Sequence, residues 1–284
     1  MTRGYDQMRR ITAPYIDRPV LALPLPRRLQ RMIFEVHSRL NSRGPDIPVR
    51  WEDVAGVPTR IATPPGARGH LLWLHGGGFA IGSPRTHAAL TDALAVATGL
   101  EVWSPAYRLA PEHPFPAAPD DCLAVARAMP GAMHIGGDSA GGNLALVTLQ
   151  ALLAEGRPPR SVVLVSPVVD MRPDRTPDPD VREMLLSRNF MRRCSRDYLA
   201  GQDDRDPRAS PLLGRYEGCP PVHLELSARE ILERDGLAIA DHLRRAGARV
   251  TLHSEPRVPH VFHICAGRSD AADRAVARLA KVLR

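Results

Sequence analysis

Short apolar runs alternate with helically patterned stretches over most of the chain. Strands are expected at 49–54, 59–63, 70–74, 101–104, 132–136, 161–166, 222–227 and 249–254. Helices are expected at 86–98, 116–129, 140–155, 233–246 and 267–283. Buried strands that alternate with helices predict an α/β fold, with a mostly parallel central sheet covered by helices on both faces.

The first 50 residues follow a different pattern. Prolines are expected to break the early part of this segment, at Pro14, Pro19, Pro24 and Pro26. A helix that ends near residues 41–45 is then predicted by apolar residues at helical spacing among arginines, namely Leu29, Met32, Ile33, Val36 and Leu40. Such a helix either packs on the domain or forms part of a lid over a site, and we favour the lid.

The alternation of strands and helices is interrupted once, between about 168 and 215. This stretch is rich in Pro, Asp and Arg, with short helical pieces expected near 180–200. A long insertion after a strand end lies where an α/β sheet carries its site. We therefore predict a catalytic domain over 51–284, capped by residues 1–50 and by an insertion at about 171–210.

Composition and charge narrow the function classes. At 284 residues and 44% hydrophobic, the chain can bury a substantial core, and it has neither an apolar run long enough for a membrane span nor a signal peptide, so we expect a soluble, cytoplasmic protein. Residues 1–50 hold ten arginines and four acidic residues, a net +6, so the remaining 234 residues carry +1 of the total +7. With only 5% aromatic residues, nucleic-acid binding is not expected.

The four cysteines are far apart and have no metal-ligand spacing. They are Cys122, Cys194, Cys219 and Cys265. In a chain without a signal peptide, they are expected to be free thiols in packing positions, and no metal site is predicted.

Two motifs indicate nucleophilic catalysis. Residues 137–141 read G-x-S-x-G between an expected strand and an expected helix, a context that exposes Ser139 as a nucleophile on a sharp turn. Residues 75–79 read HGGGF after another strand, and three consecutive glycines leave backbone amides uncovered. We expect the N–H groups of Gly77, Gly78 and Ala140 to bind an oxyanion.

A serine nucleophile needs a base and an acid. In the chain order serine, acid, histidine, the base falls in the loop after the last expected strand, where His260 is the candidate and His263 the competitor. The acid falls between residues 227 and 235, where Glu230 comes first after the strand end. The competing carboxylate, Asp235, is expected to lie in the next helix, with a favourable charge near its N-terminus.

These motifs together resemble the hormone-sensitive-lipase-like group of α/β-hydrolases. The matching pieces run in family order: HGGGF at 75–79, PAYRLAPEHPFPAAPDD at 105–121, GDSAGG at 137–142, SPVVD at 166–170 and PHVF at 259–262. The resemblance implies an α/β-hydrolase fold with a helical cap and a carboxylic ester hydrolase that needs no metal or cofactor. It also implies a structured turn beside the site at 107–115. The family most often has Asp where this chain has Glu230.

The expected reaction is acyl transfer through an acyl-enzyme. Family resemblance favours small to medium acyl esters as substrates. The basic N-terminal segment either favours an anionic substrate or is simply solvated surface. The alternatives are an amidase or N-deacetylase of a small metabolite and a non-catalytic ligand receptor on the same fold. A small-molecule ester is the expected partner, stable membrane insertion is not expected, and a homodimer is left open.

Overall fold

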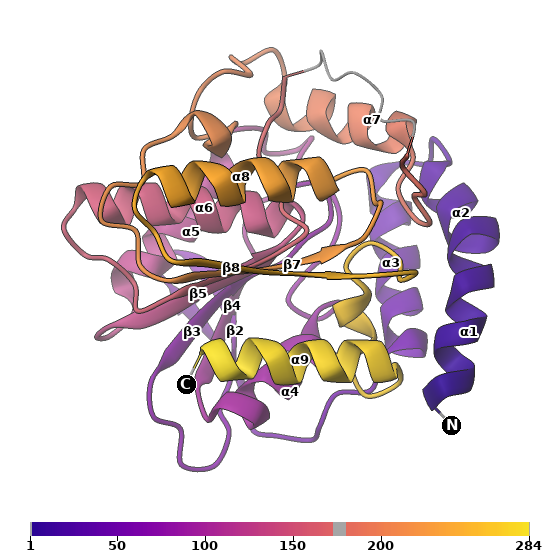
Figure 1. The fold of residues 1–284 in the computed structure, drawn as a ribbon, viewed down its shortest axis with the longest axis horizontal. Helices are drawn as coiled ribbons and strands as arrows, with labels where there is room; N and C mark the ends of the chain where they lie inside the picture. Colours follow the sequence, from indigo (N-terminus) through magenta and orange to yellow (C-terminus); the bar gives the residue numbers. More distant parts are fainter. Residues whose placement is uncertain (1, 173–179, 284) are drawn as a thin grey trace.

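The computed structural model describes residues 2–172 and 180–283, and Figure 1 shows their arrangement. The described residues form one eight-stranded sheet in the order β1-β2-β4-β3-β5-β6-β7-β8, in which β2 is antiparallel to both of its neighbours, β1 and β4, and the other neighbouring strands pair in parallel. The strands are β1 Val49–Val54, β2 Val57–Ala62, β3 His70–Leu74, β4 Glu101–Pro105, β5 Met133–Asp138, β6 Val162–Val165, β7 Val222–Ser227 and β8 Val250–Glu255. The predicted mostly parallel sheet is confirmed.

Helices cover both faces of this sheet, as predicted. In Figure 1, α4 (Ala88–Thr98) and α9 (Asp270–Val282) lie below it, and α5 (Ala117–Ala128), α6 (Ala140–Ala154) and α8 (Glu233–Arg245) lie above it. Each face buries its own apolar cluster: Leu72, Leu74 and Leu164 pack toward α5, α6 and α8, whereas Leu71 and Trp73 pack toward α4 and α9. This division follows from the alternation of side chains along each strand.

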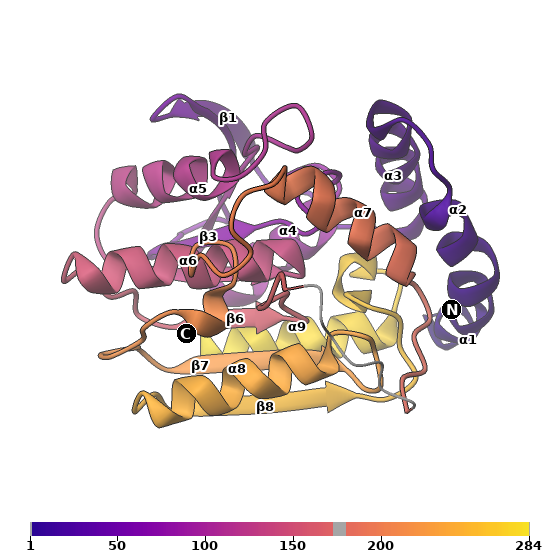
Figure 2. The same cartoon turned by 90° about the horizontal axis from the view of Figure 1, so that it is seen from above.

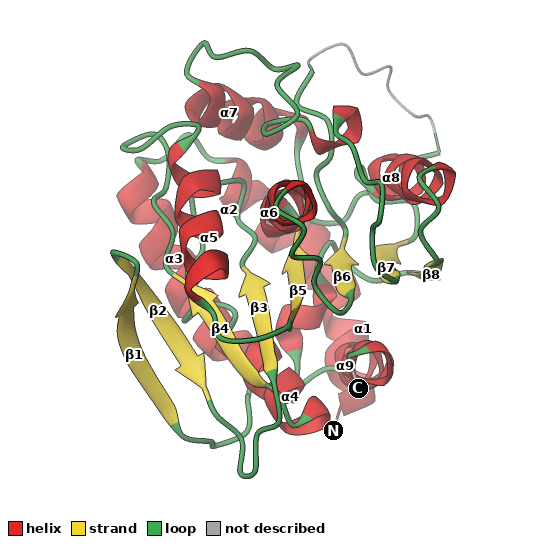
Figure 3. Cartoon of the chain, turned by 90° about the vertical axis from the view of Figure 1, so that its left-hand side faces the viewer, coloured by secondary structure: helices red, strands yellow, loops and turns green. Residues whose placement is uncertain are grey.

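The short 3-10 turns η2 (Pro211–Leu213) and η3 (Phe262–Cys265) connect these elements. Figure 3 shows the arrowheads of β3, β5 and β6 pointing toward the side of the molecule that carries α7 (Arg188–Leu199). The loops that follow these strands therefore meet at one edge of the sheet, where open α/β folds place their sites.

The N-terminal helices lie side by side at one end of the molecule (Figures 1 and 2). They are α1 (Thr2–Thr12), the π-helical segment η1 (Ala13–Asp17), α2 (Arg18–Ala22) and α3 (Arg27–Asn41). The expected breaks at Pro14 and Pro19 are wrong, because the backbone stays helical through both prolines. Thr12 and Asp17 keep α-helical dihedral angles, and a π-helical turn over Ala13–Asp17 replaces the regular hydrogen bonding there. The chain leaves helical geometry only around Pro24 and Pro26.

The apolar positions of α3 do not form its inner face. Leu29, Met32, Val36 and Leu40 are exposed, and of the five predicted apolar positions only Ile33 lines the cavity described below. The inner face instead carries Gln30, Phe34 and His37, which line that cavity. Helical spacing groups residues on a face, but it does not say which face is turned inward.

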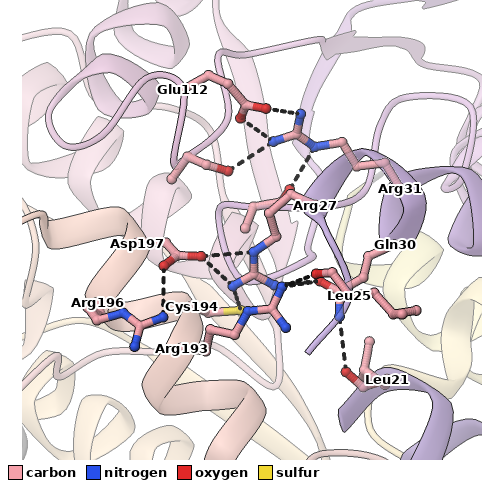
Figure 4. A network of polar contacts seen from close by, with 12 residues as sticks. Leu21, Leu25, Arg27, Gln30, Arg31, Glu112, Arg193, Cys194, Arg196 and Asp197 are labelled. Carbon is pink, nitrogen blue, oxygen red and sulfur yellow. Dashed lines mark hydrogen bonds and ion pairs between the residues drawn. The ribbon is translucent and has the colours of Figure 1, made fainter. Parts of the chain in front are cut away.

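The second predicted cap segment, at about 171–210, includes residues 173–179, which lie outside the described residues. In its described part, the expected helical pieces near 180–200 form the single helix α7. Polar contacts join α7 to α3, and Figure 4 shows a network of them. Buried Arg27 donates to Asp197 Oδ2 over 2.7 and 2.9 Å and to Gln30 Oε1 over 2.7 Å. Two segments about 160 residues apart are thus held together.

Gly136 lies in β5, where the neighbouring strands leave no room for a side chain. A Cβ at Gly136 would come within 2.6 Å of Val163 Cγ2 and 2.8 Å of Trp73. We predict that Gly136→Ala lowers the free energy of unfolding by roughly 1–3 kcal/mol through overpacking. In urea unfolding, the control Gly4→Ala, at an open helical position, should be neutral or stabilising; equal effects of the two substitutions would contradict this account.

Candidate active site

Ser139 occupies a strained turn between β5 and α6. Its φ of 54° and ψ of −117° are unusual for a residue with a side chain, and its N–H donates to Val165 O over 2.8 Å. Glycines allow the turn: a Cβ at Gly141 would lie 1.9 Å from Leu74 O, and one at Gly137 would lie 2.3 Å from Gly141 O. This is the sharp strand-to-helix turn that the G-x-S-x-G pattern predicts.

The glycine-rich loop after β3 lies beside this turn. Gly77 and Gly78 have φ of 122° and 60°, and a Cβ at Gly77 would meet Ile81 O at 2.1 Å. Within the described residues, the N–H groups of Gly77, Gly78 and Ala140 donate no hydrogen bond. Ala140 is the first residue of α6, where backbone N–H groups have no helical acceptor. Three amide donors are therefore unoccupied beside Ser139.

The loops after β7 and β8 bring Glu230 and His260 together. Glu230 Oε2 accepts from His260 Nδ1 over 2.5 Å, and both side chains are buried. The other carboxylate oxygen, Oε1, accepts from Ser166 Oγ over 2.5 Å and from the Ser227 N–H over 3.0 Å. These contacts orient the carboxylate and, through it, the imidazole ring.

The second ring nitrogen of His260, Nε2, is not used in holding the ring. It has no hydrogen-bond partner among the described residues, and His260 lines the same cavity as Ser139. Burial disfavours the imidazolium, but attraction and hydrogen bonding by Glu230 outweigh it, so the pKa of His260 is raised above its ordinary value. When His260 is neutral, its Nδ1 hydrogen points to Glu230, and the unpaired Nε2 faces the cavity.

The two competing residues lie elsewhere. Asp235 sits in the first turn of α8, as expected, and its Oδ2 accepts from the Val169 N–H over 3.1 Å. His263 is fully buried in η3, 3.7 Å from Glu225, and does not line the cavity. Of the two candidate carboxylates, it is Glu230 that contacts His260.

A second buried acid–histidine pair went unpredicted. Asp138 precedes Ser139, and its Oδ2 accepts from His87 Nε2 over 3.0 Å while its Oδ1 accepts from Trp73 Nε1 over 3.1 Å. Burial opposes its charge, but His87 and Trp73 hold the pKa of Asp138 below its ordinary value. The only available sequence signal was the acidic residue inside G-x-S-x-G.

His75 supports the glycine-rich loop as a neutral side chain. Burial, together with repulsion from His87, lowers the pKa of His75 to about 3. Its Nδ1 donates to Gly76 O over 2.8 Å, and its ring stacks on Tyr107, whose hydroxyl donates to His75 O over 2.7 Å. Tyr107 comes from the predicted structured turn at 107–115, so this turn packs against the glycine-rich loop and supports it.

A partly open cavity of about 260 Å³ lies between the two predicted cap segments and Ser139. Apolar side chains of both cap segments line it, including Ile33, Phe34, Leu186 and Phe190. A polar cluster also borders it, in which Asp17 contacts Arg9 and lies 3.3 Å from His37 Nε2. The cavity suits a small, largely apolar molecule with one polar end.

All four cysteines are free thiols, as expected. Among the described residues, no group of His, Cys, Asp and Glu could hold a metal ion. None of the described helices is long and apolar enough to cross a membrane.

The Asp138–His87 pair leads to a stability prediction. In His87→Leu, Asp138 loses the hydrogen-bond partner of its Oδ2, and burial then raises its pKa; the variant should lose roughly 3 kcal/mol of unfolding free energy at pH 7. A raised folded-state pKa makes stability fall as pH rises, so the deficit relative to wild type should grow from acidic to neutral pH. Denaturant unfolding across this range measures it, with exposed His113→Leu as control. A deficit independent of pH would contradict the account.

Comparison with known proteins agrees with this geometry. Residues 71–264 match a family model described as the alpha/beta hydrolase fold. The chain is 40% identical over 202 residues to an acetyl-hydrolase of Streptomyces hygroscopicus, covering 68% of each chain. It is 32% identical over 262 residues to an ethyl acetate hydrolase of Pseudomonas putida, covering 84% of this chain and 81% of the relative.

A solved structure extends the match to nearly the whole chain. It is an esterase from the bacterial hormone-sensitive lipase family, 31% identical, with a TM-score of 0.88 over 99% of this chain and 96% of that one. The chain therefore belongs to the α/β-hydrolase family, as a serine carboxylic ester hydrolase of the hormone-sensitive-lipase-like group.

Proposed function

We propose that this ester hydrolase works through Ser139, His260 and Glu230 on small to medium acyl esters. The observation that carries the proposal is the Glu230–His260 pair, whose Nε2 is unpaired in the cavity that Ser139 also lines. An imidazole held at Nδ1 by a carboxylate is in the tautomer that accepts a proton at Nε2. The enzymatic names of the relatives weigh against the receptor alternative.

The proposed reaction has two halves. His260 Nε2 takes the Ser139 hydroxyl proton as Oγ bonds to the ester carbonyl carbon, and the N–H groups of Gly77, Gly78 and Ala140 stabilise the resulting oxyanion. The carbon–oxygen bond to the alcohol breaks as His260 returns the proton to the leaving oxygen. Water then attacks the acyl-enzyme with the same proton transfers, which releases the acid and regenerates Ser139.

Glu230 is proposed as the acid although the family most often has Asp there. Its Oε2 bonds His260 while Oε1 is held by Ser166 and the Ser227 N–H, so the longer side chain is anchored at both oxygens. The extra methylene group of glutamate therefore leaves the carboxylate well oriented, because both of its oxygens accept hydrogen bonds.

The substrate size is proposed from the cavity. A volume of about 260 Å³ with mainly apolar walls favours short acyl or alcohol groups over long lipid chains. Two relatives have names that refer to acetyl groups or ethyl acetate, which is consistent with this range.

Ser139→Ala should abolish hydrolysis of p-nitrophenyl esters. We expect kcat to fall by at least about a thousandfold without loss of stability, because the acyl-enzyme cannot form. Wild-type kcat/KM should be highest for short chains in an acetate-to-laurate series. Retention of more than a few per cent of activity would remove Ser139 from this role, and a maximum at laurate would refute the size proposal. Matching acetanilides test the N-deacetylase alternative.

Glu230→Gln should change the pH profile as well as the rate. His260 must be neutral to act as a base, so wild-type kcat/KM should fall as pH drops through its pKa, which lies above the ordinary value. The glutamine removes the charge that raises this pKa, so the acid limb should move to lower pH while kcat drops steeply. An unchanged acid limb in the variant would rule out Glu230 as the partner. The control Asp235→Asn should leave the limb in place.

A further inference from the structure

The outer surface of the N-terminal helices is unusually apolar. Ten of the fifteen large apolar side chains that are exposed in the described structure lie between residues 8 and 40. Four of them form one stripe along α3, which we call the cap stripe: Leu29, Met32, Val36 and Leu40, with exposed fractions of 36–67%. The others lie on α1, η1, α2 and the residue that follows: Met8, Ile11, Tyr15, Ile16, Val20 and Leu23. Large apolar side chains that are exposed in such number on one group of helices indicate an interaction site.

The cap stripe takes no part in the contacts that attach α3 to the rest of the molecule. The opposite face of α3 anchors the helix through polar contacts: Arg27 bonds Asp197, and Arg31 bonds Ala80 O, Ala110 O and Glu112. Figure 4 shows these groups turned toward α7 and the body of the domain. The stripe faces away from them and contributes neither to this anchoring nor to the cavity lining.

The exposed charges that α3 itself carries have one sign. The exposed acid Glu112, from a neighbouring loop, pairs with Arg31 and is attracted less strongly by Arg28. The exposed charged residues between 4 and 43 are all arginines: Arg10, Arg28, Arg39 and Arg43. None of their side chains makes an ion pair within the described structure. Arg28 and Arg39 are eleven residues apart, about three helical turns, so they border the same flank of the stripe.

Three of the four acidic residues in the first 50 are engaged elsewhere, and the fourth, Asp46, is exposed after the end of α3. Asp6 accepts from Ser269 Oγ over 2.5 Å, Asp17 contacts Arg9 and His37, and Glu35 accepts from Ser83. None of them offsets the outward positive charge. The basic excess seen in the first 50 residues therefore falls partly on this apolar surface.

We propose that this surface docks the enzyme at an anionic lipid–water interface. Apolar side chains beside arginines are the pattern of helices that lie in the headgroup region, where the apolar face is buried and the arginines meet anionic headgroups. A second copy of the chain fits less well, because a two-fold interface on the stripe would place Arg28 and Arg39 near their own counterparts. Docking requires no membrane span.

Docking would also place the cavity close to the lipid. Ile16 and Val20 line the cavity and are themselves exposed, so the cavity reaches the apolar surface of the cap. An ester dissolved in the interface would then enter without crossing bulk water. This consequence rests on the proposed ester hydrolysis, whereas docking itself does not.

Vesicle flotation tests docking without reference to turnover. The full chain is mixed with phosphatidylcholine vesicles that contain either no anionic lipid or about a quarter phosphatidylglycerol. Wild type should partition at least about tenfold more strongly to the anionic vesicles, and about 0.5 M NaCl should weaken this binding. Because each arginine near an anionic surface contributes about fivefold in partitioning, Arg28→Gln with Arg39→Gln should lower it by roughly tenfold or more.

Matched apolar variants identify the surface. Met32→Ser with Val36→Ser should abolish flotation yet leave hydrolysis of a soluble p-nitrophenyl ester within about twofold of wild type, because neither residue lines the cavity. The control Val96→Ser with Leu237→Ser changes two similarly exposed residues on α4 and α8 and should leave flotation intact.

Three results would overturn the proposal. The first is no flotation of wild type with either vesicle, and the second is equal flotation with neutral and anionic vesicles. The third is a wild-type dimer in lipid-free sedimentation that the Met32→Ser, Val36→Ser variant dissociates, without any vesicle binding; the cap stripe would then be an interface between copies. Loss of esterase activity in Ser139→Ala with flotation preserved would separate docking from catalysis.

Discussion

The close backbone approach at Ser139 is the constraint on which the site depends. The turn holds a serine at positive φ, a conformation that surrounding structure must enforce. That enforcement comes from contacts too short for any side chain, between Gly141 and Leu74 O and between Gly137 and Gly141 O. The same contacts bring the end of β3 against the start of α6. Because these glycines lack a Cβ, the start of the glycine-rich loop can lie directly against the first turn of α6.

Two buried acid–histidine pairs lie near this turn, and their hydrogen bonding separates their roles. In the Asp138–His87 pair, Trp73 and His87 occupy the two carboxylate oxygens, and Thr86 lies 2.9 Å from His87 Nδ1. No polar atom of that pair remains for a substrate, so it fixes the strand end beneath the nucleophile. In the Glu230–His260 pair, one ring nitrogen is left over. A saturated pair stabilises structure, whereas an unsaturated one retains the capacity to move a proton.

The sequence was sufficient for the parts of the site that depend on chain order. Strand ends of a parallel sheet meet at one edge, so Ser139, Glu230 and His260 could be placed together from the elements they follow. The Asp138–His87 pair could not be found this way, because His87 precedes a helix and its partner is set by three-dimensional packing. The helical path through Pro14 and Pro19 was missed for a related reason: the sequence does not show whether a proline breaks a helix or is accommodated by a local change in its hydrogen bonding.

The orientation of α3 shows most clearly what hydrophobic periodicity cannot predict. Its spacing identified an amphipathic helix correctly, but an apolar stripe normally marks the buried face, and here it does not. The reversal is possible because α3 is anchored by arginines: Arg27 and Arg31 make charge-assisted bonds inward that substitute for apolar packing. The arginine-rich composition of this segment therefore splits into two sets with different consequences. The arginines that turn inward hold α3 over the cavity. Those that turn outward lie beside exposed apolar side chains, whose contact with water is unfavourable.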